Sequence, residues 1–197
     1  FESQSWPVIQ QRWMKWLRTL QANQHARPTE EQLQLIECIH RRTKPEHFLE
    51  QELPLDEDIK DMTTQPMMHL VHGLPGAGKS KVLMWLQEYW QTVWHYEKGV
   101  HFTFVAYSNS MADNVEGFTM HSFFGLPWKT TSGAVVNTHD ADDWTTLITK
   151  MSLLKFVIID EVEAAGLSML NRINERLQEI TSRHVRYRKA NGDVNGI

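Results

Sequence analysis

Two different hydrophobic patterns meet at about residue 67 of the chain. Before this point, apolar residues recur at intervals of three and four positions over 6–24 and again over 27–42. This periodicity predicts two amphipathic helices, the second of which begins with a capping Thr29 and two acids in its first turn. The acidic, proline-bearing stretch 50–66 has little periodicity and predicts a linker or a mobile insertion.

After residue 67, short apolar runs bounded by turn residues alternate with helical patterns. The apolar runs predict buried strands at 67–72, 101–107 and 155–160. The helical patterns predict helices at 80–94, 110–117 and 167–183. Strands and helices in alternation predict an α/β protein whose parallel sheet is flanked by helices.

Aromatic residues are concentrated on two of the predicted helices. In the first helix, near-helical spacing is shown by Val8, Trp13, Trp16, Leu17 and Leu20, and the tryptophans are expected to anchor packing. In the helix at 80–94, one face carries Leu83, Leu86, Trp90 and Trp94, with Trp85 and Tyr89 to one side. This spacing favours a face turned toward the core, and a platform for stacking bases is the alternative.

The amino-acid composition is typical of an ordinary soluble protein. Of the 197 residues, 41% are hydrophobic and 22% charged, and the net charge of -4 gives no overall basic surface. Nucleic-acid binding would therefore need a local surface. The single cysteine, Cys38, cannot form an internal disulfide and is expected to be a small buried residue. No apolar run reaches the roughly 20 residues of a membrane span, so we expect no membrane contact.

A glycine-rich loop joins the strand predicted at 67–72 to the helix predicted at 80–94. Its sequence GLPGAGKS fits the pattern G-x-x-x-x-G-K-[ST]. Glycines allow backbone N–H groups to turn toward phosphate oxygens, and a helix N-terminus adds a favourable dipole. We expect Lys79 to contact the β and γ phosphates, and the Ser80 hydroxyl to take a magnesium ion. The predicted nucleotide-binding residues are Gly73, Pro75, Gly76, Ala77, Gly78, Lys79 and Ser80.

Two adjacent acids follow the apolar strand predicted at 155–160. Asp160 stands at the carboxyl end of that strand, which is where open α/β sheets bind their ligands. It is expected to face the magnesium ion, and Glu161 to orient and deprotonate an attacking water. Together with the glycine loop, this pair predicts a catalytic set of Lys79, Asp160 and Glu161 that binds ATP with Mg²⁺ and hydrolyses it.

The stretch 104–126 combines hydroxyl, imidazole and aromatic side chains after a predicted strand. Such groups suit binding of a single nucleic-acid strand by stacking and by phosphate contacts. A core segment in which His121 is satisfied internally is the alternative, and the residue types alone favour neither.

The order of residues in this stretch resembles a block of PIF-like DNA helicases of superfamily 1B, which are relatives of RecD. The helicase block is A-x-T-G-x-A-A-x-x-x-x-G-x-T-x-H-S-F, and the matching residues are Ala106, Ser108, Ala112, Gly117, Thr119, His121, Ser122 and Phe123. The resemblance extends from residue 28 to 180. It includes PTEEQ at 28–32, similar to the adenine-recognising motif with Gln32 as the matching glutamine, as well as GLPGAGKS and VIIDEVEAAG.

This resemblance implies a RecA-like motor domain over 28–197, preceded by a helical extension over 1–27. It also implies translocation from 5' to 3' on single-stranded DNA, with DNA contacts from Ser108, Asn109, His121, Ser122 and Phe123. The chain departs from the family pattern at Ser108 and Asn109, where threonine and glycine are usual. It departs again at Glu163 and Ala164, where the family's D-E-[IV]-S-M carries serine and methionine. These departures affect the coupling of nucleotide state to DNA rather than the hydrolytic residues.

The resemblance further implies parts that the 197 residues do not include. The family carries a G-D-x-x-Q-L strand and a second motor domain after the position of Ile197, so we expect the fold to be incomplete at its C-terminus. We also expect weak ATP hydrolysis by the chain alone, since the second domain supplies arginines to the ATP site. Such a helicase is intracellular, in the nucleus or mitochondrion if eukaryotic. A P-loop switch or kinase-like protein that uses no DNA, and a degenerate transposon-derived interaction module, remain as alternatives.

Overall fold

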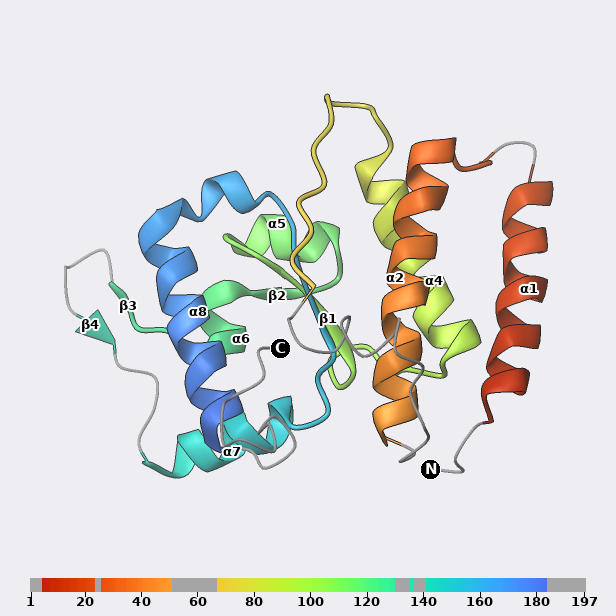
Figure 1. The fold of residues 1–197 in the computed structure, drawn as a ribbon. Helices are drawn as coiled ribbons and strands as arrows, with labels where there is room; N and C mark the ends of the chain where they lie inside the picture. Colours follow the sequence, from red (N-terminus) through yellow and green to blue (C-terminus); the bar gives the residue numbers. More distant parts are fainter. Residues whose placement is uncertain (1–4, 24–25, 51–66, 130–134, 137–140, 184–197) are drawn as a thin grey trace. The chain divides into compact units, whose positions relative to one another are not determined.

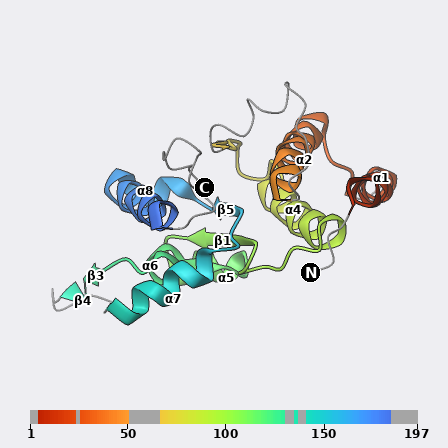
Figure 2. The same cartoon turned by 60° about the horizontal axis from the view of Figure 1, so that its bottom comes forward.

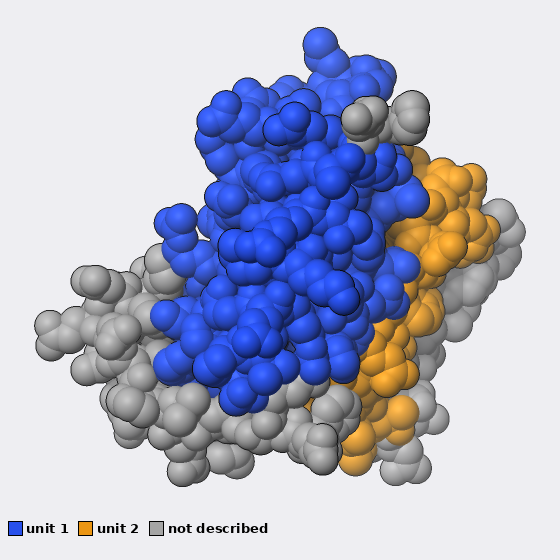
Figure 3. Space-filling view, turned by 90° about the vertical axis from the view of Figure 1, so that its right-hand side faces the viewer, with its two compact units in different colours: residues 1–96 blue, residues 97–197 orange. Residues whose placement is uncertain are grey.

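The computed structural model describes residues 5–23, 26–50, 67–129, 135–136 and 141–183. The chain forms two compact units, Phe1–Tyr96 and Glu97–Ile197, which are coloured separately in Figure 3. The helix of the predicted N-terminal extension belongs to the first unit together with the phosphate loop, so the compact units do not divide at residues 27 and 28. The predicted linker lies almost entirely outside the described residues.

Three helices make up the described core of the first unit: α1 (Trp6–Ala22), α2 (Glu30–Glu50) and α4 (Lys79–Val93) (Figure 1). Helix α2 begins with a reciprocal cap. The Gln32 backbone N–H donates to the Thr29 hydroxyl at 3.3 Å, and the Thr29 N–H donates to the Gln32 side-chain oxygen at 2.9 Å. The predicted helix at 27–42 is therefore confirmed, and it continues to residue 50.

The aromatic residues of α1 and α4 form the core of the first unit. Trp13, Trp16 and Leu20 are buried as predicted, whereas Val8 is exposed and Ile9 faces the core in its place. On α4 the buried residues are Val82, Trp85, Leu86, Tyr89, Trp90 and Val93. A platform on α4 for stacking bases is therefore excluded, because these rings are enclosed by the neighbouring helices.

The strand predicted at 67–72 does not form. This segment has no regular secondary structure, and Met68 and Leu70 are 91% and 76% exposed. A strand is stable only when its backbone groups pair with another strand. The described residues of the first unit contain helices and no strand that could pair with it. The prediction from the apolar run was wrong for this reason.

The second unit contains a parallel sheet of three strands: β1 (Phe102–Ala106), β2 (Phe118–Thr119) and β5 (Phe156–Ile159). The strand order is β2-β1-β5, with Val105 opposite Ile159 in one ladder and Ala106 opposite Thr119 in the other. The central strand β1 is fully buried as predicted. Strand β5 is only half-buried, because it lies at the edge of this sheet.

Helices and a small ladder surround this sheet (Figure 2). In chain order they are α5 (Asn109–Asn114), α6 (Met120–Phe124), β3 (Trp128–Lys129), β4 (Val135–Val136), α7 (Ala141–Met151), the 3-10 turn η2 (Val162–Ala164) and α8 (Gly166–Arg183). The sequence did not predict α7 or the antiparallel pair β3–β4. Side chains from α6, α7, α8 and β1 share one apolar core.

The turn between α5 and β2 requires a glycine. A Cβ at Gly117 would lie 2.3 Å from the carbonyl oxygen of Phe104, which is backbone of the central strand. No side chain fits at this distance, so the glycine allows the turn to approach β1 and sets β2 beside it.

Two further predictions concern the burial of Cys38 and membrane-spanning segments. Cys38 is exposed rather than buried, because its position on α2 points away from the core. Within the described residues, none of the helices combines the length and the hydropathy needed to cross a bilayer.

Candidate active site

The glycine loop ends where α4 begins, as the sequence predicted. Gly76 and Gly78 both have φ of 83°, a left-handed conformation that side chains rarely adopt. Gly78 is the N-cap of α4, and no side chain caps this helix. Because the first N–H groups of a helix have no intrahelical acceptor, they remain available to an anion at this end. The loop and helix thus form a cradle of the kind that holds phosphate.

Lys79 folds back over the loop from the first position of α4. Its ammonium group donates to the carbonyls of Gly73 at 2.7 Å and Leu74 at 3.3 Å. The side chain is exposed, as is Ser80 next to it. The positive charge is therefore held at the mouth of the cradle, where an anionic phosphate gains from it without displacing core side chains.

Gln32 connects α2 to the same loop. Its amide nitrogen donates to the carbonyl of Ala77 at 3.1 Å, although 45 positions separate the two residues. A Cβ at Gly78 would lie only 2.8 Å from this nitrogen. The structure thus brings the glutamine of the predicted adenine motif into contact with the phosphate loop, and the close approach explains the need for glycine at position 78.

The acid pair lies in the second unit, directly after β5. The Asp160 N–H donates to the carbonyl of Val105 at 2.9 Å, which continues the ladder by one bond beyond the strand. Glu161 has φ of 47° and ψ of 52°, a left-handed conformation for a residue with a side chain. Among the described residues His95 and Glu116 also have positive φ, and residues in such conformations cluster at active sites, ligand clamps and switch regions. Both acids are at the carboxyl edge of the sheet, as predicted, and Glu161 is exposed.

The predicted DNA-contacting residues follow β1 and β2 at this same edge. Ser108 caps α5 by accepting from the Met111 N–H at 3.4 Å, and Thr119 caps α6 by accepting from the Ser122 N–H at 3.1 Å. The side chains of Asn109 and Ser122 are exposed. The parallel register therefore gathers these polar groups and Asp160 at one edge of one sheet.

Phe123 is the exception within this set. It is 1% exposed and packs edge-on against Phe124 in the core of the second unit, with ring centroids 5.1 Å apart. A buried ring cannot stack on a base, so the expectation that Phe123 contacts DNA is corrected. Its position on the inner face of the short helix α6 determines this burial.

The structure adds two residues that the sequence reasoning missed. Tyr107 is 42% exposed and packs edge-on against the His121 ring, with centroids 6.1 Å apart. Partial burial, and secondarily the positive charge of Arg172, lower the pKa of His121 below its usual value. Both effects favour the neutral imidazole over the protonated ring. Tyr107 could have been found from its position immediately after the predicted strand, whereas the contribution of Arg172 needed the folded chain.

A parallel sheet flanked by helices, with a glycine loop ahead of one helix and an acid at the end of a strand, defines an α/β P-loop NTPase. The family model described as an AAA domain matches residues 56–186, which is more than half of the chain. The chain belongs to this family, and its P-loop domain is of the ATPase class. No curated protein and no solved structure matches the chain significantly.

Proposed function

We propose that the chain is the ATP-hydrolysing motor domain of a DNA helicase, which uses ATP to move along single-stranded DNA in the 5' to 3' direction. The observation that supports this most directly is the shared sheet edge. The acid pair expected to serve ATP hydrolysis and the polar residues expected to contact DNA follow the carboxyl ends of adjacent parallel strands.

Mechanical coupling is the physical reason that this arrangement matters. The Asp160 backbone N–H donates a hydrogen bond to the Val105 carbonyl in β1, and Ser108 follows Val105 by three residues. This connection through β1 is the path by which a displacement at the acid pair would reach the polar residues.

The polar groups themselves suit a phosphate backbone. Ser108 and Thr119 hold the N-terminal ends of α5 and α6, where N–H groups are directed outward. The amide of Asn109 and the hydroxyl of Ser122 are exposed beside them, and the half-buried His121 adds an imidazole donor or acceptor. These contacts are independent of sequence, which fits a protein that moves along DNA.

The phosphate loop fits ATP, and the roles proposed for its residues combine the observed contacts with the family resemblance. Lys79 holds the β and γ phosphates, and Gln32, which contacts the loop through Ala77, is assigned the adenine by its match to the family motif. Ser80 and Asp160 hold Mg²⁺, which when bound neutralises charge on the phosphates. Among the described residues there is no cluster of three or more metal-ligating side chains. Glu161 orients and deprotonates the attacking water.

Strand binding at the sheet edge is tested by two matched asparagines of α5. Asn109 and Asn114 are both exposed and stand at opposite ends of the same helix, but only Asn109 lies at the edge that carries the acids. We expect Asn109→Ala, combined with His121→Ala, to weaken binding of a fluorescein-labelled oligonucleotide several-fold in anisotropy titrations. Asn114→Ala should leave the affinity unchanged.

Two results would contradict the proposal. The first is equal affinity of all variants for the oligonucleotide, which favours a P-loop switch that uses no DNA. The second is a loss of folding in the Asn109 and His121 variant, seen as a collapsed thermal transition, because this would make the block a packing element. ATP binding measured in parallel separates either result from damage to the phosphate loop.

A further inference from the structure

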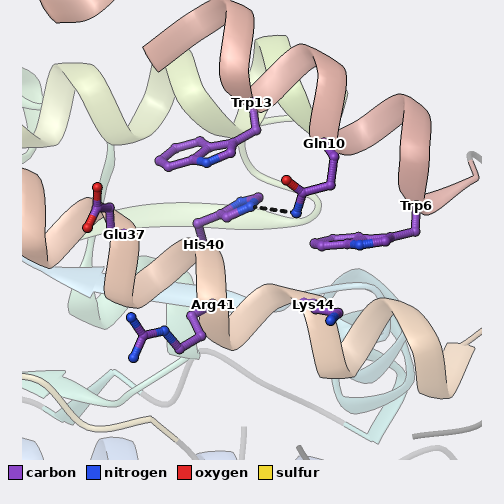
Figure 4. A pocket seen from close by; sticks show the side chains of 7 residues that line it. All are labelled: Trp6, Gln10, Trp13, Glu37, His40, Arg41 and Lys44. Atoms are coloured by element: carbon purple, nitrogen blue, oxygen red, sulfur yellow. Dashed lines mark hydrogen bonds between the residues drawn. The ribbon is translucent and has the colours of Figure 1, made fainter. Parts of the chain in front are cut away.

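A cleft of about 300 Å³ opens between α1 and α2 in the first unit, apart from the phosphate loop. Trp6, Gln10 and Trp13 line it from α1, and Glu37, His40, Arg41 and Lys44 line it from α2 (Figure 4). This volume is at the small end of ligand sites and matches a group of about the size of one nucleotide.

The rings in this cleft are held nearly parallel. The His40 ring stacks on Trp13 with centroids 4.1 Å apart and an interplanar angle of 9°, and Trp6 lies 5.8 Å from His40 at 20°. Trp6 is only partly buried, whereas Trp13 is fully enclosed. Phe48 and Trp94 also contact the Trp6 ring, with centroids 5.7 and 6.2 Å away, so the cleft offers an incoming planar ring only the part of Trp6 that stays exposed.

Hydrogen bonds fix the orientation of this stack. The Gln10 amide nitrogen lies 3.3 Å from His40 Nε2, and His40 Nδ1 lies 2.8 Å from the Tyr89 hydroxyl oxygen. The indole N–H of Trp94 donates to the same oxygen at 2.6 Å. Because an amide nitrogen can only donate, Gln10 donates to Nε2 and keeps one N–H and its carbonyl oxygen for a ligand. The cleft thus offers a donor and an acceptor beside an aromatic surface.

Positive charge lies at the rim of the cleft. The Lys44 ammonium is 5.4 Å from the centroid of the Trp6 ring, and Arg41 is exposed and forms no ion pair within the described part of the chain. Glu37 is the only acid among the lining residues. Helix α1 itself carries three cations and no acid, although the whole chain has a net charge of -4. Positive charge is therefore local to this part of the surface, which complements an anion.

We propose that this cleft binds a nucleotide unit of a single nucleic-acid strand. The base stacks on Trp6 with its edge toward Gln10, and Arg41 and Lys44 contact the adjoining phosphates. An aromatic ring combined with flanking cations is the pattern by which proteins hold single strands without sequence preference. The proposal does not depend on the helicase function, because it needs neither ATP nor the sheet edge of the second unit.

The test uses the 197-residue chain without nucleotide and a fluorescein-labelled dT12 oligonucleotide followed by anisotropy. We expect Arg41→Gln with Lys44→Gln to weaken binding about ten-fold and to make the affinity less dependent on salt, since two phosphate contacts are lost. Lys15→Gln is the matched control, because Lys15 is an exposed cation of α1 that does not line the cleft. It should change the affinity less than two-fold.

The aromatic contribution is tested separately. Trp6→Leu keeps an apolar side chain at the edge of the core and should weaken binding of dT12 about five-fold or more. An abasic strand of the same length should bind wild type about as weakly as dT12 binds this variant. Far-ultraviolet circular dichroism checks folding, and Gln10→Ala gives a second variant at the cleft if Trp6→Leu unfolds.

Each of the other outcomes overturns the proposal. Equal binding of abasic strand and dT12 rules out stacking. Binding of a mononucleotide as tightly as dT12 makes the cleft a site for free nucleotides, and preferential binding of an acidic aromatic peptide makes it a protein-docking site. Cleft variants that bind dT12 normally, while Asn109→Ala and His121→Ala weaken it, would leave the helicase proposal standing and refute this one.

Discussion

Lowering the pH should destabilise the first unit, because this unit contains the buried histidine His40. Burial lowers the pKa of His40 from 6.5 to about 4, because its ring is enclosed between Trp13 and Tyr89. The charged groups on the same side of α2 are Glu37, Arg41 and Lys44, and burial rather than their charge causes the lowered pKa of His40. The folded chain therefore holds His40 neutral at a pH where the unfolded chain binds a proton.

The sign and size of the effect follow from linkage. Between pH 6.5 and about 4 the unfolded state binds more protons at this position than the folded state, so the free energy of unfolding falls as the pH falls. The contribution is fully present above pH 6.5 and lost as the pH approaches 4. The two pKa values differ by about two and a half, which corresponds to at most about 3 kcal/mol.

The measurement is urea denaturation of wild type and His40→Gln from pH 7.5 to 4. Glutamine can still hydrogen-bond to Tyr89 but does not titrate, and the other histidines are common to both proteins. Tryptophan emission reports mainly on the first unit, which holds six of the eight tryptophans. We expect wild type to lose up to about 3 kcal/mol more than His40→Gln over this range.

The same pH dependence in both proteins would refute this reasoning. So would a pKa of His40 near 6.5 in an NMR titration, because the ring would then be solvated in the folded chain. Destabilisation of His40→Gln at pH 7.5 alone would not bear on it, since lost stacking on Trp13 lowers stability at every pH.

Three further predictions concern the phosphate loop, the acids and the sheet. Lys79→Ala should abolish binding of a fluorescent ATP analogue while the circular dichroism spectrum stays unchanged, because the exposed ammonium supports no core packing. An unchanged affinity for the analogue would refute the assignment of this loop as a phosphate-binding loop. Asp160→Asn should weaken magnesium-dependent ATP binding, whereas Glu161→Gln should keep that affinity and stop phosphate release, since an amide cannot accept a proton. Equal losses of affinity in the two acid variants would contradict this division of roles. Gly117→Ala should lower stability by about 1–3 kcal/mol, because its Cβ would meet the Phe104 carbonyl at 2.3 Å; an unchanged Tm would show that the turn can move away.

The sequence alone was sufficient to predict the features that depend on residues close together along the chain. The phosphate loop is a run of eight consecutive residues that contains its glycines and its lysine, and a helical pattern follows it directly. Asp160 was predictable in the same way, because an apolar run of strand length ends directly before it. The reciprocal cap of Thr29 and Gln32 is equally local. For these features, the conformation follows from backbone preferences and from hydrogen bonds within one turn of chain.

The tertiary structure decided which side chains face solvent and which segments pair. Phe123 and Tyr107 are both aromatic residues of the same stretch, yet one is enclosed and the other exposed. The run at 67–72 has the composition of a strand but no strand to pair with in the described residues of its unit. The contact of Gln32 with Ala77 crosses 45 positions. Burial, pairing and long-range contact depend on which elements meet, and periodicity within one element carries no information about its partner.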